Sequence, residues 1–474
     1  MPLEPPSPTP TPADDLAATR GDLRATGHEY QSVKDELRTN LLSRLADGEP
    51  TLPGIVGFDD TVVPEVERAV IAGHDFVLLG ERGQGKTRLA RTLVTLLDEW
   101  TPVVAGCEIN DHPYAPVCVR CRRLQAEVGD ALPVAWRHRS ERYGEKLATP
   151  DTSVGDLIGD VDPIKVAEGR TLGDPETVHY GLLPRTNRGI FAVNELPDLA
   201  ERIQVSLLNV LEERDVQVRG YQLRLPLDVM LVASANPEDY TNRGRIITPL
   251  KDRFGAEVRT HYPTDVDHEL TLLRQEADLH AMVPGFLLEV VARFTRQVRH
   301  SSAVDARSGV SARFAVAGAE TLAAAAARRA AITGESPPVA RPVDLATIVP
   351  TLRGKVEFEV SEEGRELDVL AHLLRQATAE VFRSRLAGTD LDGFVQRFDD
   401  GSTVVTGDLV SGADVLSEAG PIDGLARVMQ RLGVEAGESP GLAAAALEFV
   451  LEGLWLTRRI DKEVVGGRSM FTAS

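Results

Sequence analysis

A loop of glycines ahead of a lysine and a threonine gives this sequence its first recognisable chemistry. Residues 80–87 read GERGQGKT, which fits the spacing G-x-x-x-x-G-K-T, and they follow the apolar run 76–79. Such a loop turns its backbone N–H groups toward phosphate oxygens, while Lys86 would reach the terminal phosphates and Thr87 would offer its hydroxyl to Mg²⁺. The segment predicts a nucleoside triphosphate site between a strand and a helix over 88–99. The glycines that shape the loop are Gly80, Gly83 and Gly85.

A carboxylate able to activate water follows a second buried strand. The apolar run 189–193 ends in Asn194 and Glu195. In nucleotide hydrolases of this plan two acids end such a strand: the first holds Mg²⁺ through water, and the second orients and deprotonates the attacking water. Glu195 is therefore the predicted catalytic base. Asn194 stands at the metal position but brings no negative charge, so we expect weaker Mg²⁺ binding.

Three polar residues further along the chain could also act on the nucleotide. Asn236 follows the strand predicted over 228–233 and could hydrogen-bond the γ-phosphate or its attacking water. Arg253 could act on a neighbouring subunit's nucleotide as an arginine finger, and a salt bridge to Asp252 is the alternative. Arg313 begins an Ala-rich helix and could fold back onto phosphate.

The cysteines of the chain could hold a metal. All three fall between positions 107 and 121. Cys118 and Cys121 have the C-x-x-C spacing of a metal knuckle, and Cys107 with His112 would complete a Cys₃His tetrahedron suited to Zn²⁺. Three thiols without a metal are the alternative, because one C-x-x-C is much weaker support than two. A structural zinc site therefore stays open.

Alternating strands and helices must position these residues. Beyond them the sequence predicts helices alone. The pattern is α/β up to about residue 260 and helical from about 265, with an irregular insertion over 150–188 and a hairpin over 215–225. Residues 1–20 are dense in Pro, Thr and Asp, and we expect them to be a disordered leader. We predict three parts: a nucleotide-binding domain over 21–262 that begins with a helix, a helical lid over 263–360, and a mostly helical region over 361–474.

Charge and composition limit the partners. The 474 residues include 52 Lys and Arg against 72 Asp and Glu, for a net charge of −20. Such a surface repels nucleic acid and anionic membranes, so we expect neither as a partner. No run approaches the roughly 18 apolar residues of a membrane-spanning helix, and three cysteines cannot supply a disulfide framework. We expect a cytoplasmic protein.

These motifs occur in the order found in AAA+ ATPases, and four further stretches make the chain resemble the magnesium-chelatase ATPase-subunit (subunit I-like) branch. The resemblance covers about residues 21–355. It implies a P-loop core of three α/β/α layers with a parallel sheet, followed by an α-helical lid. The four stretches are IVG at 55–57, DLIG at 156–159, GLLPRTNRG at 181–189 and LLNVLEE at 207–213.

The same resemblance implies an activity and its partners. Members bind and hydrolyse ATP with Mg²⁺ in a hexameric or heptameric ring, with nucleotide at the subunit interfaces. Glu195 would be the base, Asn236 the first sensor, Arg253 the finger in trans and Arg313 the second sensor. Such a ring remodels or activates a partner protein, which in this branch carries a von Willebrand A-type domain. Magnesium insertion into a porphyrin is the narrower possibility.

Two other classes of function stay open. A sigma-factor-interacting transcription activator shares this ATPase core, but it needs a GAFTGA-like loop and usually a helix-turn-helix module, and the sequence shows neither. The amide at Asn194 favours the other class, an ATP-dependent switch that hydrolyses slowly.

Overall fold

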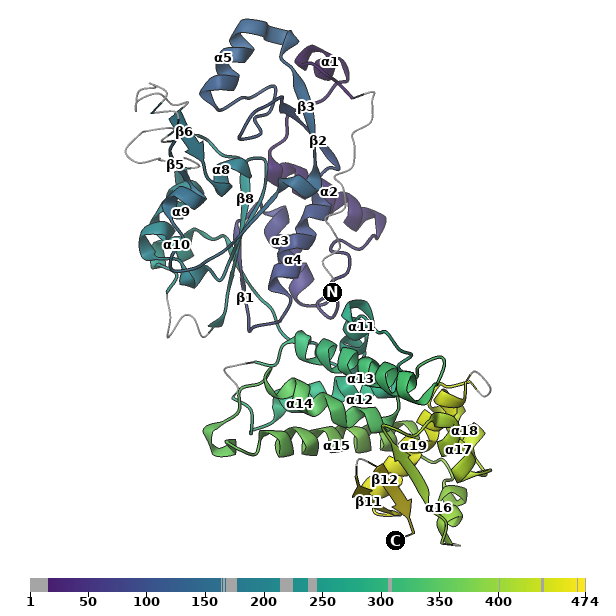
Figure 1. Ribbon diagram of the computed structural model, residues 1–474. Helices are drawn as coiled ribbons and strands as arrows, with labels where there is room; N and C mark the ends of the chain where they lie inside the picture. The colour runs from purple at the N-terminus through teal and green to yellow at the C-terminus, as the bar shows by residue number, and fades with distance from the viewer. Residues whose placement is uncertain are drawn as a thin grey trace. The chain divides into compact units, whose positions relative to one another are not determined.

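The computed structural model describes most of the chain, in two compact units. The first runs from Met1 to His261 and the second from Tyr262 to Ser474 (Figure 1). None of the helices described is long and apolar enough to cross a membrane. The described residues are 16–162, 164, 167, 177–213, 225–237, 245–305, 309–399, 401–435, 439–466 and 468–473.

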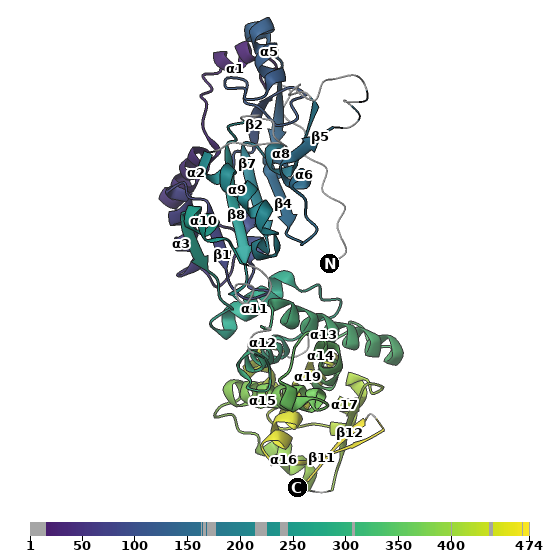
Figure 2. The ribbon, with the colours of Figure 1, turned by 90° about the vertical axis from the view of Figure 1, so that its left-hand side faces the viewer.

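A parallel five-stranded sheet forms the centre of the first unit (Figure 2). Every neighbouring pair is parallel, so the carboxyl ends of the strands meet at one edge. In order across the sheet, the strands are β4 (Tyr143–Leu147), β7 (Gly189–Asn194), β8 (Val229–Ala235), β1 (Phe76–Leu79) and β9 (Ala256–Arg259). β1, β7 and β8 are buried along their whole length, as expected for strands covered on both faces.

Helices cover both faces of this sheet. Side chains alternate along β1, so Phe76 and Leu78 pack into one layer and Val77 and Leu79 into the other. The first layer contains α2 (Val33–Asp47), α3 (Val62–Ile71) and α4 (Lys86–Thr92), and the second contains α9 (Glu201–Glu213) and α10 (Thr248–Arg253). Figure 1 shows the two sets on opposite sides of the sheet. The predicted α/β/α core with a parallel sheet is confirmed.

Smaller elements of the first unit lie outside this sheet. The antiparallel pair β2 (Trp100–Val104) and β3 (Val134–His138) is accompanied by α1 (Arg20–Ala25) and α5 (Val119–Val128). The predicted insertion contains α6 (Val154–Leu157), α8 (Leu182–Arg185) and the antiparallel pair β5 (Gly159–Val161) and β6 (Val178–Tyr180). Its residues 163, 165–166 and 168–176 lie outside the described residues, as do the predicted leader up to residue 15 and the predicted hairpin except Leu225.

The helix after the phosphate loop is shorter than predicted. The sequence predicted residues 88–99, whereas α4 begins at Lys86, ends at Thr92 and continues only as a 3₁₀ turn over Leu93–Leu96. The hydroxyls of Thr92 and Thr95 donate to backbone carbonyls at 3.0 and 2.8 Å. Threonines weaken a helix because their hydroxyls compete for its backbone groups and their branched side chains are restricted. The earlier start places Lys86 in the first turn.

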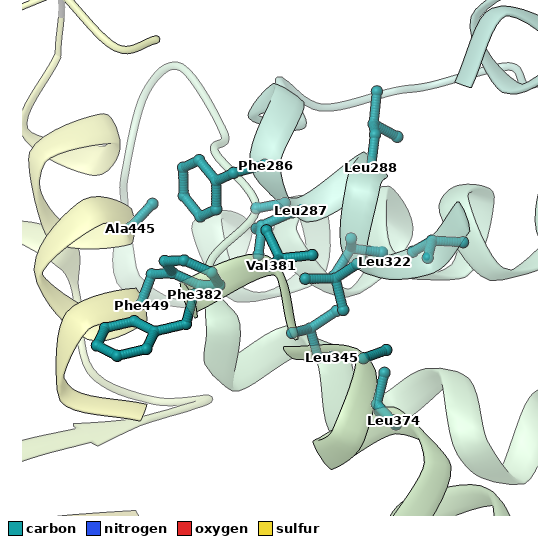
Figure 3. Close-up of a cluster of buried hydrophobic side chains, with 14 of the residues drawn as sticks. Phe286, Leu287, Leu288, Leu322, Leu345, Leu374, Val381, Phe382, Ala445 and Phe449 are labelled. Carbon is teal, nitrogen blue, oxygen red and sulfur yellow. The ribbon is translucent and has the colours of Figure 1, made fainter. Parts of the chain in front are cut away.

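The second unit is mostly helical, as predicted for this part of the chain. Figure 3 shows the core where α12 (Gly285–His300), α15 (Glu366–Arg385) and α19 (Pro440–Leu456) meet. The Phe286 and Phe449 ring centroids lie 4.7 Å apart, and those of Phe382 and Phe449 lie 6.2 Å apart. A small antiparallel sheet was not predicted; its strands, in order, are β10 (Val404–Gly407), β12 (Arg468–Thr472) and β11 (Asp461–Val465). The elements are α11 (Val266–Glu276), α12 (Gly285–His300), α13 (Ala312–Thr333), α14 (Ile348–Arg353), α15 (Glu366–Arg385), α16 (Asp392–Asp399), β10 (Val404–Gly407), α17 (Gly412–Ala419), α18 (Leu425–Arg431), α19 (Pro440–Leu456), β11 (Asp461–Val465) and β12 (Arg468–Thr472).

Candidate nucleotide-binding site

The phosphate loop joins the end of β1 to the start of α4, and steric constraints explain why three of its positions are glycine. Gly83 and Gly85 have φ angles of +74° and +76°, in the left-handed region that glycine adopts without strain. At Gly80 a Cβ would lie 2.0 Å from Thr260 Oγ1 and 2.2 Å from Gln84 Oε1. Thr260 Oγ1 donates to Gln84 Oε1 at 2.8 Å, which anchors the loop against the residue that follows β9.

A chain of hydrogen bonds joins the lysine of the loop to the predicted catalytic acid. Lys86 Nζ donates to Asn236 Oδ1 and to the carbonyl oxygen of Glu81, each at 2.8 Å. Asn236 Nδ2 donates in turn to Glu195 Oε2 at 2.5 Å. Lys86 and Asn236 are both buried, where hydrogen bonds that involve charged groups are stronger than in water. Three of the predicted residues therefore share one network at the carboxyl edge of the sheet.

The backbone at Glu195 takes a conformation that residues with side chains rarely adopt. Its φ and ψ are +55° and +47°. The N–H of Glu195 donates to Ser234 Oγ on β8 at 3.2 Å, which holds the turn. Such backbone strain costs about 1–3 kcal/mol and concentrates at functional sites. The turn takes Glu195 out of the line of β7, and its carboxylate meets Asn236 beyond the neighbouring strand.

Asn194 contacts the carboxylate of Glu145, a residue on the neighbouring strand that the sequence patterns did not reveal. Asn194 Nδ2 donates to Glu145 Oε1 of β4 at 2.6 Å. Glu145 also accepts from Arg91 Nε and Nη2 of α4, at 2.7 and 3.0 Å, and this hydrogen bonding raises the pKa of Arg91. Arg91 follows Thr87 by one helical turn, so Glu145 contacts the face of α4 on which the Thr87 side chain lies.

A cavity of about 390 Å³ opens beside the phosphate loop, at the carboxyl ends of β1 and β9. Its charged lining includes Glu257, which lies 3.6 Å from Lys251 and 3.2 Å from Arg259. The cavity provides space for part of a ligand next to the phosphate-binding backbone. The lining residues are Leu79, Gly80, Glu81, Gln84, Pro237, Lys251, Glu257, Arg259 and Thr260.

Comparisons with known proteins found sequence relatives of this chain. The family model described as "Sigma-54 interaction domain" matches residues 170–253. Over 252 residues the chain is 31% identical to the magnesium-chelatase 38 kDa subunit of Acidiphilium rubrum, which covers 51% of this chain and 61% of that one. Over 272 residues it is 29% identical to the subunit of the same name from Rhodobacter capsulatus, which covers 53% and 69%. The chain is therefore similar in sequence to magnesium-chelatase subunits over about half of its length.

The match to these subunits is partial in length. The chain spans about three fifths of the first of these relatives, 61%. A solved complex between subunits BchI and BchD of magnesium chelatase is similar with a TM-score of 0.35 and 22% identity, and covers 66% of this chain and 97% of that chain. NtrX from Brucella abortus in complex with ADP is similar with a TM-score of 0.39 and 15% identity, and covers 73% and 66%. The similarity to magnesium-chelatase subunits thus rests on the sequence relatives alone.

The two arginines to which the AAA+ resemblance gives a role are both exposed. Arg253 ends α10 and pairs with Glu212 at 2.8 Å and Asp252 at 3.0 Å. The salt bridge that the sequence offered as the alternative to a finger is thus present, and the hydrogen bond to Glu212 raises the pKa of Arg253. Arg313 lies in the first turn of α13, in the second unit. The roles of finger and second sensor stay predictions.

The three cysteines lie together, but without the predicted fourth ligand. Asp111, rather than His112, accompanies their sulfur atoms. His112 Nδ1 accepts from the Tyr114 N–H at 3.0 Å, and His112 Nε2 lies 3.2 Å from His28 Nε2, so both ring nitrogens are engaged elsewhere. Asn110 has a left-handed φ of +58° directly before Asp111, a turn that the sequence pattern did not predict. The structure therefore corrects the proposed ligand set.

Proposed function

We propose that this protein binds Mg²⁺-ATP at the phosphate loop and hydrolyses it, with Glu195 as the general base. The observation that carries the proposal is the hydrogen-bonded chain Lys86–Asn236–Glu195. It connects the group that binds phosphate to a carboxylate that could take a proton from water. The relatives support it, because they are magnesium-chelatase subunits that share this core.

Each member of the chain has a distinct task. Lys86 Nζ now donates to oxygen acceptors of the loop and of Asn236, which are the partners that phosphate oxygens would replace. Asn236 would hold the attacking water or the γ-phosphate, since its amide lies between the ammonium group and the carboxylate. Glu195 would orient the water and accept its proton.

The residues around this network fit Mg²⁺, which prefers oxygen ligands. Thr87 offers a hydroxyl, and Asn194 offers an amide oxygen that now accepts from Ser234 Oγ at 3.3 Å. Glu145 supplies the negative charge that Asn194 lacks, because its carboxylate lies 2.6 Å from the Asn194 amide. When bound, Mg²⁺ would neutralise charge on the phosphates. We therefore propose Glu145 as the compensating acid of the metal site.

We further propose that the chain works as a hexameric or heptameric ring that remodels or activates a partner protein. Arg253 would then reach the nucleotide of the neighbouring subunit, for which its exposure is suitable, and Arg313 would contact the phosphates from the lid. The sequence relatives are themselves subunits of magnesium chelatase, an enzyme in which subunits BchI and BchD form a complex, and this supports a protein partner. We propose that this partner carries a von Willebrand A-type domain.

A second candidate is an activator of sigma-54-dependent transcription, because the family model at 170–253 bears that description. It predicts ATP-dependent open-complex formation by sigma-54 RNA polymerase when the protein is added. A chelatase-type motor predicts no such stimulation.

Steady-state hydrolysis of Mg²⁺-ATP by the full chain tests the main proposal. Glu195→Gln should lower turnover at least hundredfold, since general base catalysis contributes about 10²–10⁴-fold, and it should leave nucleotide binding intact. Glu201→Gln is the matched control, because Glu201 is an exposed glutamate at the start of α9. Absence of turnover in the wild type at saturating Mg²⁺-ATP would contradict the motor and favour the slow switch.

Mixing two inactive variants tests the ring. Arg253→Ala lacks the finger and Glu195→Gln lacks the base, so each alone should be nearly inactive. In a mixed ring an intact base meets an intact finger at some interfaces, and activity should return in part. If mixing restores nothing although the variants co-assemble, Arg253 does not act in trans.

A further inference from the structure

A largely buried cluster of three thiols and one carboxylate lies away from the phosphate loop. Cys107 follows the end of β2, and Cys118 and Cys121 lie at the start of α5. Asp111 lies in the turn between them. The sulfur atoms and a carboxylate oxygen all lie within 4.8 Å of one another. Four potential ligands thus converge from two short loops of one small subdomain.

Backbone hydrogen bonds orient these ligands. The Asp111 N–H donates to Cys107 Sγ and the Cys121 N–H to Cys118 Sγ, both at 3.3 Å. The Cys118 N–H donates to Asp111 Oδ2 at 2.9 Å. Cys107 Sγ and Cys118 Sγ are 4.0 Å apart. Two sulfurs at Zn–S distances of about 2.3 Å in a tetrahedron would be about 3.8 Å apart, so the observed spacing is close to that edge.

One buried carboxylate oxygen of Asp111 lacks a hydrogen-bond partner among the described residues. This oxygen is Oδ1, and the side chain is fully buried. A buried carboxylate oxygen without a partner is costly, and a bound cation removes that cost. This observation is independent of the cysteine spacing, and it points to a positive ligand in the cluster.

A disulfide and a site completed by His112 both fit less well. A disulfide needs sulfur atoms about 2.05 Å apart, and it would leave Asp111 Oδ1 unsatisfied. A site completed by His112 conflicts with the contacts of both ring nitrogens of that residue.

We propose that Cys107, Asp111, Cys118 and Cys121 bind one structural Zn²⁺. Four protein ligands close the coordination sphere, so the ion has no open position for catalysis. Its role is to fasten the loop after β2 to the start of α5. Because α5 begins at Val119, directly between the two cysteines of the knuckle, loss of the ion should loosen this subdomain while the parallel sheet stays folded. The proposal does not depend on ATP hydrolysis.

Metal analysis of the full-length protein, purified under reducing conditions without a metal column, tests the proposal. We expect about one zinc per chain in the wild type. Asp111→Asn and Cys118→Ser should lose it, whereas His112→Gln and Glu108→Gln should keep it; Glu108 is an exposed acid inside the same segment. Retention by Asp111→Asn together with loss by His112→Gln would overturn the ligand set.

Cobalt substitution of the wild type gives a readout that needs no variant to fold. Co²⁺ exchanged into the site should show thiolate-to-cobalt charge-transfer absorption in the near ultraviolet and the intense visible bands of a tetrahedral ion. If the wild type contains no zinc and Co²⁺ gives no such bands, the site does not exist.

Discussion

The contact between Asn194 and Glu145 allows a charge-swap experiment. Asn194→Asp would place a second carboxylate where the amide now lies 2.6 Å from Glu145 Oε1. With an effective dielectric constant of about 20, two unit charges about 3 Å apart repel by roughly 5 kcal/mol, and after relaxation to 4 Å by about 4 kcal/mol. Arg91 pairs with Glu145 but is largely exposed, so solvent screens its compensation. We expect Asn194→Asp to destabilise the metal-free first unit by about 2–4 kcal/mol.

The double variant Glu145→Gln/Asn194→Asp moves the acid from β4 to β7 and removes the repulsion. It should regain most of the lost stability, whereas Glu145→Gln alone should cost about 1 kcal/mol or less because its pair with Arg91 is near the surface. Thermal unfolding in EDTA and in Mg²⁺ measures this, with hydrogen exchange of β7 and β8 amides to read the first unit separately. Mg²⁺ should raise the unfolding temperature of Asn194→Asp more than that of the wild type.

Additive effects of the two substitutions would contradict this interpretation. If Asn194→Asp is as stable as the wild type in EDTA, and the double variant is no more stable than the sum of the singles predicts, then the two side chains do not interact. Glu145 would then not be the compensating acid of the metal site.

Three further predictions follow from buried groups. Glu36→Gln breaks a buried bidentate pair in which both contacts with Arg142 are 2.6 Å, and it should lower the free energy of unfolding of the first unit by about 3–5 kcal/mol, measured in urea. Asp130→Asn is the control: it removes the exposed pair with Arg24 and should cost under about 1 kcal/mol. Equal losses in the two variants would contradict this. Gly80→Ala should weaken ATP binding at least tenfold, measured with a fluorescent ATP analogue, because a Cβ there collides with Thr260 and Gln84; unchanged affinity would show that the loop yields. Burial raises the pKa of Glu448 to about 7, against the opposing effect of Arg341, so protonated Glu448 stabilises the folded state. This contribution to the free energy of unfolding is complete below the unfolded pKa of about 4.5 and is lost as the pH rises through 7. Hydrogen exchange of α19 should therefore quicken from pH 5 to 8 beyond the intrinsic pH effect in the wild type, but not in Glu448→Gln, which mimics the protonated acid.

The sequence was sufficient to single out three residues that the structure places together; their roles stay predictions. Lys86, Glu195 and Asn236 each end or follow a strongly apolar run, and parallel strands bring such ends to one edge of a sheet. Their mutual hydrogen bonds follow from that topology. The α/β class and the helical second half were also predictable, because buried strands appear as apolar runs and helices as apolar residues at helical spacing.

Glu145 could not be found in this way. Its strand, Tyr143–Leu147, is only partly buried and reads YGEKL, with a glycine and two charged residues, so no periodic signal marks it. The signal available was the missing acid at Asn194, which implies that a neighbouring element supplies the charge.

Asp111 was missed for a different reason. Ligand spacing treats Asp111 and His112 as near equivalents, and the choice between them depends on the backbone turn at Asn110. Short strands such as β10 escaped prediction as well, because four residues that contain a glycine carry too little pattern.

The nucleotide that the protein retains after incubation with Mg²⁺-ATP shows whether Glu195 is the catalytic base. Rapid desalting and chromatography of the bound nucleotide give the ratio of ATP to ADP on the chain. We predict mainly ADP on the wild type and on Glu201→Gln, and unhydrolysed ATP on Glu195→Gln. If Glu195→Gln retains ADP in the same proportion as the wild type, Glu195 is not the base, and the proposed mechanism of this site is wrong.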